Sequence, residues 1–444
     1  MTARAGIEEK RDTTWLFYGY LVLLTFEWLG LQNDLPFLKI LRFTTLLGYG
    51  LVIAAIARCG VGDLFRRPQA RIFVTFIVFT VMSLAWAVVT EHAFNAIRPL
   101  VDFTVFFVLT VTLIDRPKRI VQVALTFVLI VTALVARNLS VLGDAMRASA
   151  FAAGPFLGDG NDFAWGMVIA LPIVGYLTLG QRSFLLRAAG AFGAVICLMG
   201  VVGTASRGSS LGLAGALLFY LLFVSRHKLR TALSIAVLAL GVLFLAPSGY
   251  MDRMKSIAAY QEDSSAQSRL TLWRAAFDMS LDYPLGVGAG NFSSAYGRFY
   301  SPVGDRAEGG SEVMWAPGRW LNAHSIYFKT LGEYGMLGLL LVVSLIVINV
   351  RSSLEMRARC LMQGARAAIP AEWPGLVAMS TVGFAICGIF LGGFSYPHMF
   401  LLSGLVVANS RMVEQETAVT SRRTRAGPGR QARPGYRRGS EASR

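Results

Sequence analysis

The sequence predicts an all-α polytopic membrane protein with about twelve transmembrane helices. Hydrophobic residues make up 55% of the 444 positions and charged residues only 15%, whereas a soluble domain of this length needs more polar surface. The apolar residues occur in stretches separated by short charged breaks. A bilayer core about 30 Å thick requires roughly 20 apolar residues per helix, so each stretch is long enough to cross it.

The expected spans follow one another without a cleavable signal peptide, because no small-residue cleavage site follows the first apolar run. We place them near residues 15–32, 37–57, 71–90, 98–114, 119–136, 161–180, 184–203, 209–225, 229–247, 325–350, 373–392 and 396–411. The expected organisation is a cytoplasmic N-terminus at 1–14, nine helices over 15–247, a large periplasmic loop at 248–323, three helices over 324–411 and a basic disordered cytoplasmic tail at 412–444.

Arginine and lysine gather in alternate loops, which the positive-inside rule assigns to the cytoplasm. These basic stretches lie at 58–71, 116–119, 182–187, 226–230 and 351–366, and both termini are basic as well. An even number of spans agrees with this placement. Topology therefore explains most of the +16 net charge, so we expect contact with anionic membrane lipids and no nucleic-acid partner. The four cysteines fall in or beside expected spans and predict no disulfide framework.

The segment 248–323 is far longer than an ordinary connection, and long loops of this kind usually carry function. Within it, an apolar residue recurs at helical spacing up to Pro284, which predicts an amphipathic helix. The expected apolar stripe consists of Leu270, Trp273, Phe277 and Leu281. Arg269 and Arg274 flank this stripe and could sit at a membrane-facing rim, or could simply snorkel.

A glycine-rich run, Gly286-Val-Gly-Ala-Gly-Asn-Phe292, follows this helix. It superficially resembles a phosphate-binding loop, but it lacks the strand before it and the helix after it that such loops require. We therefore favour a tight turn over direct phosphate contact.

His324 is the leading candidate for acid–base chemistry. It lies in Asn322-Ala323-His324-Ser325, at the start of the tenth expected span. The dipole at a helix N-terminus disfavours the imidazolium, so the ring would stay neutral and able to accept a proton. A purely structural role is the alternative. His92 and His398 are rival bases in expected outer loops, but neither has a neighbouring motif.

Three further polar residues lie where membrane topology does not call for them. Arg207 is in a short outer loop, where it either caps a helix or touches a lipid phosphate, or else binds an anionic substrate group. Glu333 is an intramembrane carboxylate, functional or paired with a buried cation. Asp162, in a cluster with Asp159 and Asn161, either caps a helix or binds sugar hydroxyls, and capping is favoured for the cluster. No Asp-x-Asp pair or His/Cys cluster indicates a metal site, and no cofactor is expected.

Several of these residues resemble the motifs of the O-antigen ligase family. His324-Ser325, nine residues and Gly335-x-x-Gly338 resemble the family's histidine motif, and Arg207-Gly-Ser-Ser-Leu211 matches its Arg-x-x-x-Leu motif. The stretches 269–273 and 284–292 also resemble the start of that family's periplasmic loop. The similarity is concentrated between about residues 203 and 338.

This resemblance implies a membrane glycosyltransferase of the GT-C superfamily in a bacterial inner membrane, with its active site facing the periplasm. The donor would be a glycan on undecaprenyl diphosphate, and the acceptor a sugar hydroxyl of lipid A-core. His324 would be the catalytic base, and Arg207 and Arg269 would bind the diphosphate, with Arg274 and Arg319 as further ligands. The supporting residues would be Glu333, Asn322 and Asp162.

Other functions stay open. A polysaccharide polymerase or a protein O-oligosaccharyltransferase would share the fold and the donor, and would differ only in the acceptor. A transporter for a lipid-linked glycan is less favoured, because its charges should line both halves of a pathway, whereas the notable residues here gather at the expected outer face.

Overall fold

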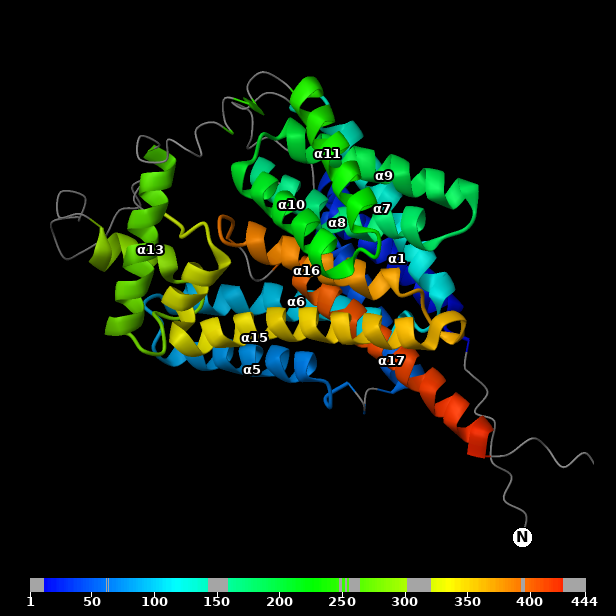
Figure 1. Ribbon diagram of the computed structural model, residues 1–444. Coiled ribbons are helices and arrows are strands. Elements are labelled where there is room, and N and C mark those ends of the chain that lie inside the picture. Colours follow the sequence, from blue (N-terminus) through cyan, green and yellow to red (C-terminus); the bar gives the residue numbers. More distant parts are fainter. Residues whose placement is uncertain are drawn as a thin grey trace, which may run out of the picture.

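The computed structural model describes residues 12–60, 62, 64–142, 159–246, 250, 251, 254, 264–301, 321–392 and 396–425. Within these ranges the chain is almost entirely helical and contains no β-strand, as Figure 1 shows. The helices are α1 (Thr14–Leu29), α2 (Leu31–Asp34), α3 (Pro36–Ile40), α4 (Phe43–Cys59), α5 (Pro68–Met82), α6 (Thr90–Leu113), α7 (Pro117–Arg137), α8 (Gly160–Gly180), α9 (Phe184–Gly203), α10 (Arg207–Phe219), α11 (Lys228–Leu245), α13 (Ser264–Asp282), α14 (Phe292–Ala295), α15 (Ile326–Gln363), α16 (Glu372–Cys387) and α17 (Pro397–Arg425).

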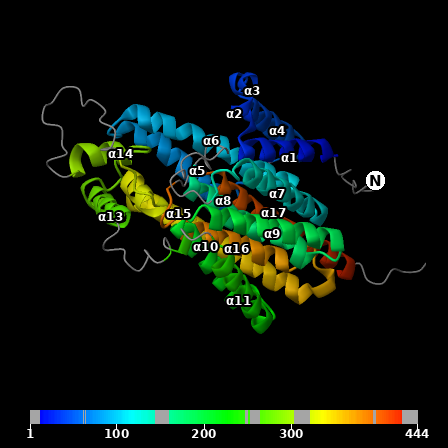
Figure 2. The same cartoon turned by 90° about the horizontal axis from the view of Figure 1, so that it is seen from above.

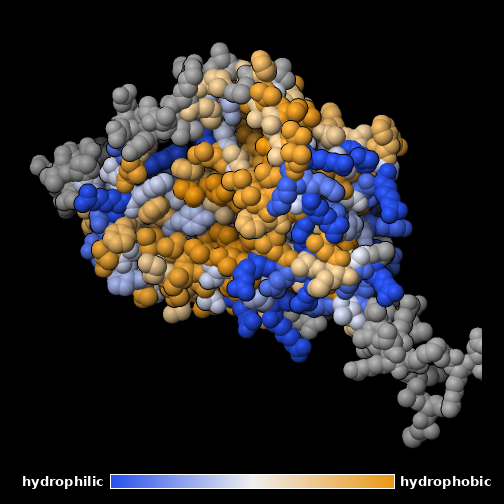
Figure 3. Space-filling view, in the orientation of Figure 1, coloured by the Kyte–Doolittle hydropathy of each residue, from blue (hydrophilic) through white to orange (hydrophobic). Residues whose placement is uncertain are grey.

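Each of the twelve expected spans coincides with one of these helices, which confirms the all-α polytopic fold. Seven helices in the described part of the chain are long and apolar enough to cross a membrane, and α4 and α16 are shorter apolar helices. In Figure 3, hydrophobic side chains cover the middle of the visible face, and hydrophilic ones gather toward its two ends. The protein is therefore a multi-pass membrane protein.

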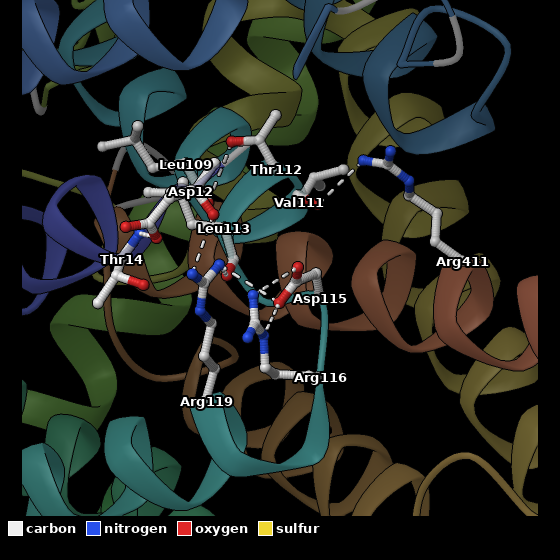
Figure 4. Close-up of polar contacts among 11 residues, drawn as sticks. Asp12, Thr14, Leu109, Val111, Thr112, Leu113, Asp115, Arg116, Arg119 and Arg411 are labelled. Carbon is white, nitrogen blue, oxygen red and sulfur yellow. Dashed lines mark hydrogen bonds and ion pairs between the residues drawn. The ribbon is translucent and has the colours of Figure 1, made fainter. Parts of the chain in front are cut away.

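The first and last described helices reach the same end of the bundle, and α13 lies across the opposite end (Figures 1 and 2). Polar contacts tie the terminus end together. The Arg67 guanidinium pairs with the Glu414 carboxylate at 2.7 Å, which joins the start of α5 to α17. In Figure 4, Arg119 donates to the carbonyl oxygen of Leu113 at 2.7 Å and Arg411 donates to that of Val111. The basic residues expected on one side of the membrane thus meet at one end of the molecule.

Helices α8, α16 and α17 form the interior of the bundle. Their large side chains are almost completely buried, among them Trp165, Trp373 and Phe384. Helix α16 packs against α8, α10 and α15, and α17 packs against α6. Helices α4, α9 and α11 instead expose large apolar side chains on the outside, as expected for helices that face lipid.

Small residues on α10 allow it to approach α16 closely. A Cβ atom at Gly212 would lie 2.1 Å from the sulfur of Cys387, and one at Gly208 would lie 2.8 Å from the Cβ of Phe390. Gly208 and Gly212 are four residues apart, the spacing that brings helix backbones together in membranes. This packing fixes the start of α10, where Arg207 lies.

The glycine-rich run forms a tight turn against a kink in α15, as favoured from the sequence. The kink is at Gly335, whose φ of 63° and ψ of −165° suit glycine alone. The backbone N–H groups of Val287 and Gly288 donate to the carbonyl oxygens of Gly332 and Glu333 at 2.9 and 3.1 Å. Because this backbone already pairs with α15, phosphate binding by the run is not supported.

One expectation about the helices is wrong. Helix α17 continues through residues 412–425, which were expected to be disordered, because Met412 and Val413 pack into the core.

The apolar stripe expected on α13 lies on the surface of the protein: Leu270, Phe277 and Leu281 are exposed, and only Trp273 of that stripe is partly buried. The buried face consists of Leu272, Ala275, Ala276 and Met279.

Replacing Gly335 with Ala is expected to lower the stability of the protein. A Cβ atom there would lie 2.1 Å from the carbonyl oxygen of Pro284, and the backbone conformation alone costs a non-glycine residue about 1–3 kcal/mol. We expect a thermal transition several degrees lower in detergent. Gly241→Ala in α11 is the matched control, because nothing lies within 4 Å of its Cβ position; equal transitions in both variants would contradict this account.

Candidate functional site

His324 lies at the start of α15, at the end of the bundle covered by α13. Its backbone adopts a left-handed conformation with φ of 46°, which is uncommon for a residue other than glycine. The strain is held on the C-terminal side by Ser325, the N-cap of α15, and by a 2.9 Å hydrogen bond from Ile326 N to the carbonyl oxygen of Gly388. The imidazole is exposed, so a substrate can reach it.

Trp273 of α13 holds the other side of His324. The indole Nε1 donates to the carbonyl oxygen of Ala323 at 2.9 Å, and its ring stacks on Phe328 with a centroid distance of 4.7 Å. Helix α13 is thereby fixed over the start of α15. Arg269 lies one turn before Trp273, on the same side of α13, and therefore next to His324.

The charges around His324 favour its neutral form. Partial burial lowers the pKa of His324, the neighbouring Arg269 lowers it further, and Lys329 adds a smaller effect, while Asp159 acts in the opposite direction. The sequence alone attributed a neutral ring to the helix dipole. In the structure, desolvation and adjacent cations are the main causes. A neutral imidazole near pH 7 can accept a proton from a hydroxyl group.

Arg207 is the first residue of α10 and is half-buried. The preceding residue, Ser206, caps α10 and donates to the side-chain oxygen of Asn161 at 2.8 Å, which links the start of α10 to the start of α8. The carbonyl oxygens of Gly200 and Val202, at the end of α9, accept hydrogen bonds from Thr204 N and Ala205 N. The last carbonyl groups of α9 thus have backbone partners.

Residues 387–392, at the end of α16, join these elements. Gly388 accepts the hydrogen bond from Ile326, and Phe390 lies against Gly208 beside Arg207. A Cβ atom at Gly392 would lie 3.5 Å from the Cα of His324. The 387–392 segment is therefore a common wall that brings the starts of α10 and α15 together.

Other predicted site residues are placed differently. Arg274 is exposed and, at 100° per residue, is turned about 140° around α13 from Arg269. Arg319 lies outside the described residues. Asn322 is next to the site, but its side-chain oxygen accepts from Ala323 N at 2.9 Å, which stabilises the turn before His324.

Glu333 has a structural partner. Its side chain is buried and accepts hydrogen bonds from the backbone of Gly290 and Phe292, so it anchors the glycine-rich turn to α15. Asp162, near the start of α8, accepts a 2.8 Å hydrogen bond from the Tyr396 hydroxyl. Of the cluster expected to cap this helix, Asp159 does so, because its carboxylate accepts from Asn161 N at 2.7 Å.

The other histidines are placed unlike His324. The His92 ring pairs with the Ser294 hydroxyl at 2.9 Å. His398 is buried among the aromatic rings of Trp28, Trp165 and Tyr396. His227 precedes α11, at the end of the bundle opposite to α13. His324 is thus the one histidine of the four in the sequence that is exposed at the α13 end.

Sequence reasoning missed Lys329 and Phe390. Lys329 lies in the first turns of α15 and places a second positive charge near His324; its position five residues after His324 was a signal that could have found it. Phe390 lay inside an expected span, and nothing in its local sequence indicates contact with α10 and Trp273.

The comparison with protein families matches residues 192–343 to the model described as O-antigen ligase. This match, which covers about a third of the chain, supports assignment of the protein to the O-antigen ligase family. The matched range contains Arg207, Arg269 and His324, together with α13 and the start of α15. No curated protein matches the chain significantly. The family and the multi-pass helical fold indicate a membrane glycosyltransferase-like enzyme of the O-antigen ligase or polymerase type.

The depressed pKa of His324 can be measured without an activity assay. Diethylpyrocarbonate modifies the neutral imidazole, and mass spectrometry follows the rate at His324 as the pH changes. We expect a half-maximal rate below pH 6.5, the ordinary value. Arg269→Ala should move the midpoint upward, because a repelling cation is removed. Arg274→Ala on the same helix should leave it unchanged, and equal shifts in the two variants would contradict the assigned electrostatics.

Proposed function

We propose that this protein transfers a glycan from undecaprenyl diphosphate to a sugar hydroxyl of lipid A-core. The observation that carries the proposal is the neutral, exposed His324 beside Arg269, joined to the start of α10 and Arg207 through the 387–392 segment. A proton acceptor flanked by guanidinium groups suits a reaction in which a hydroxyl attacks and a diphosphate leaves.

The reaction assigned to this site is a single displacement. His324 accepts the proton of the acceptor hydroxyl while the hydroxyl oxygen bonds to the anomeric carbon. The bond from that carbon to the diphosphate oxygen breaks, and the electron pair leaves with undecaprenyl diphosphate. Arg207 and Arg269 stabilise the charge that develops on this leaving group. Because two arginines can supply this neutralisation, we propose a metal-independent transfer.

The proposed orientation places α13 on the periplasmic side of a bacterial inner membrane. The positive-inside rule supports it, because Arg67, Arg119 and Arg357 lie toward the end that carries the termini. The exposed stripe of α13, made of Leu270, Phe277 and Leu281, then lies at the membrane boundary, where a helix with one apolar face is stable.

A polymerase would use the same donor and the same base, and would differ in the acceptor. The contacts around His324 favour neither acceptor over the other. The ligase assignment therefore rests on the family, and the experiment below is designed so that loss of polymerase activity has a different outcome.

Replacing His324 with Ala should abolish transfer in a strain that lacks the native gene. Loss of a general base costs roughly 10²–10⁴-fold in rate, so long glycan should accumulate on the lipid carrier while the core stays bare. Core that carries a single repeat would instead indicate a polymerase. Unchanged glycan in both pools would refute the glycosyltransferase assignment. His92→Ala is the matched control, because that ring pairs with Ser294 and is less exposed than His324.

Replacing Arg207 with Ala should weaken use of the donor without preventing membrane insertion. We expect kcat/KM for the lipid-linked donor to fall roughly 10²-fold, as for loss of one charge-stabilising donor group. Arg207→Lys should recover only part of this loss, because an ammonium cannot make a bidentate contact with phosphate. Purified protein and a fluorescent lipid-linked donor provide the measurement, and full activity of the alanine variant would exclude the assigned role.

A further inference from the structure

A basic cavity lies at the opposite end of the bundle from His324. It has a volume of about 520 Å³ and opens between α11, the start of α16 and a π-helical turn at Tyr220–Val224 that ends α10. The polar side of its wall contains three arginines and several hydroxyl groups. The polar wall includes Arg226, Arg230, Arg357, Thr231, Ser234 and Glu372.

The charge of this cavity is not balanced by its own residues. Three arginines face one glutamate, Glu372. Arg226 and Arg357 are close enough for their positive charges to act on each other, and Glu372 acts favourably on Arg357. Among the residues that the structure describes, neither Arg226 nor Arg230 has an ion-pair partner. An anion placed between the arginines would relieve this repulsion.

The hydrogen bonds to the backbone of the π-helical turn come from residues other than Arg226 and Arg230. Lys228 donates to the carbonyl oxygens of Leu221 and Leu222, and Arg357 donates to that of Val224. The carbonyl groups freed by the π-helical turn are thus satisfied by Lys228 and Arg357. Arg226 and Arg230 line the cavity instead.

The remaining wall of the cavity is apolar. Leu217 of α10 and Ile235 and Leu238 of α11 line it. No described residue of α11 is buried, and α11 packs mainly on the π-helical turn. Figure 2 shows α11 at the edge of the bundle, beyond α10 and α16. A groove that is basic at one end and apolar along its length matches an amphiphile with an anionic head.

We propose that this cavity binds an anionic glycerophospholipid of the cytoplasmic leaflet. The phosphate lies between Arg226, Arg230 and Arg357, and an acyl chain lies along Ile235 and Leu238. Anionic lipids of this leaflet attract basic residues near the surface. The positive-inside rule explains why arginines lie on this side, but it does not explain why three converge on one cavity with an apolar wall.

The lipid would fill the cavity between α11 and the rest of the bundle. It would thereby also support the C-terminal end of α10. Helix α10 begins with Arg207 and ends in the wall of this cavity. The inference rests on the proposed orientation of the bundle, and it does not depend on the proposed glycosyl transfer.

The test uses the full-length protein in nanodiscs of phosphatidylethanolamine, with or without phosphatidylglycerol. We expect phosphatidylglycerol to raise the Tm by about 2–4 °C, because a ligand that binds the folded state stabilises it. The double variant R226Q/R230Q should lose this rise. The matched control is R182Q/R187Q, which removes two exposed arginines outside the cavity, one from the connection between α8 and α9 and one from the first turn of α9.

An equal loss in the control variant would overturn the site, because it would show a general surface effect. An equal rise from inorganic phosphate without anionic lipid would overturn the lipid assignment. A photoactivatable phosphatidylglycerol gives an independent measurement on the wild-type protein, in which no variant has to fold. Labelling should map to residues 235–238 of α11, and labelling spread evenly over α9 and α11 would contradict the proposal.

Discussion

The close approach of the glycine-rich turn to the kink in α15 is the contact on which the outer end of the molecule depends. At Gly335 the helix leaves its regular path, and Val287 and Gly288 pair with the carbonyl groups exposed just before it. At this backbone contact there is no room for a side chain at Gly286 of the turn or at Gly335 of α15. The contact anchors the chain just after the C-terminal end of α13. Trp273 of α13 is then placed to donate its hydrogen bond to Ala323, just before the start of α15. The kink in α15 thus supports the glycine-rich turn and α13.

The polar groups around this contact have different roles, although they look alike in the sequence. Glu333 is an intramembrane carboxylate, yet its partners are backbone N–H groups of the turn. His324 has a strained backbone and an exposed ring. Strain of this kind persists only where the surrounding structure determines it, and here Trp273, Ser325 and Gly388 do so. Glu333 thus stabilises the turn against α15, whereas His324 exposes its ring at the start of the same helix.

The sequence predicted the positions of the helices, the large loop and the start of α15, because hydropathy and proline or polar boundaries mark them directly. It did not predict which face of α13 is buried. Two apolar stripes satisfy the same helical period, and the one with Ala275 and Ala276 is buried because small side chains allow the closer approach. The 387–392 segment was hidden inside an apolar run. Its contacts with Gly208 and His324 join residues far apart in the chain, and local patterns carry no information about them.

The exposed apolar stripe on α13 has a consequence for substrate choice. If Leu270, Phe277 and Leu281 rest on the bilayer, they set the height of His324 above the membrane plane. Donor and acceptor in the proposed reaction are both anchored in that plane by lipid chains. Only a sugar whose distance from its lipid anchor matches the height of His324 can then react. The modified sugar is therefore selected by this distance as well as by its shape.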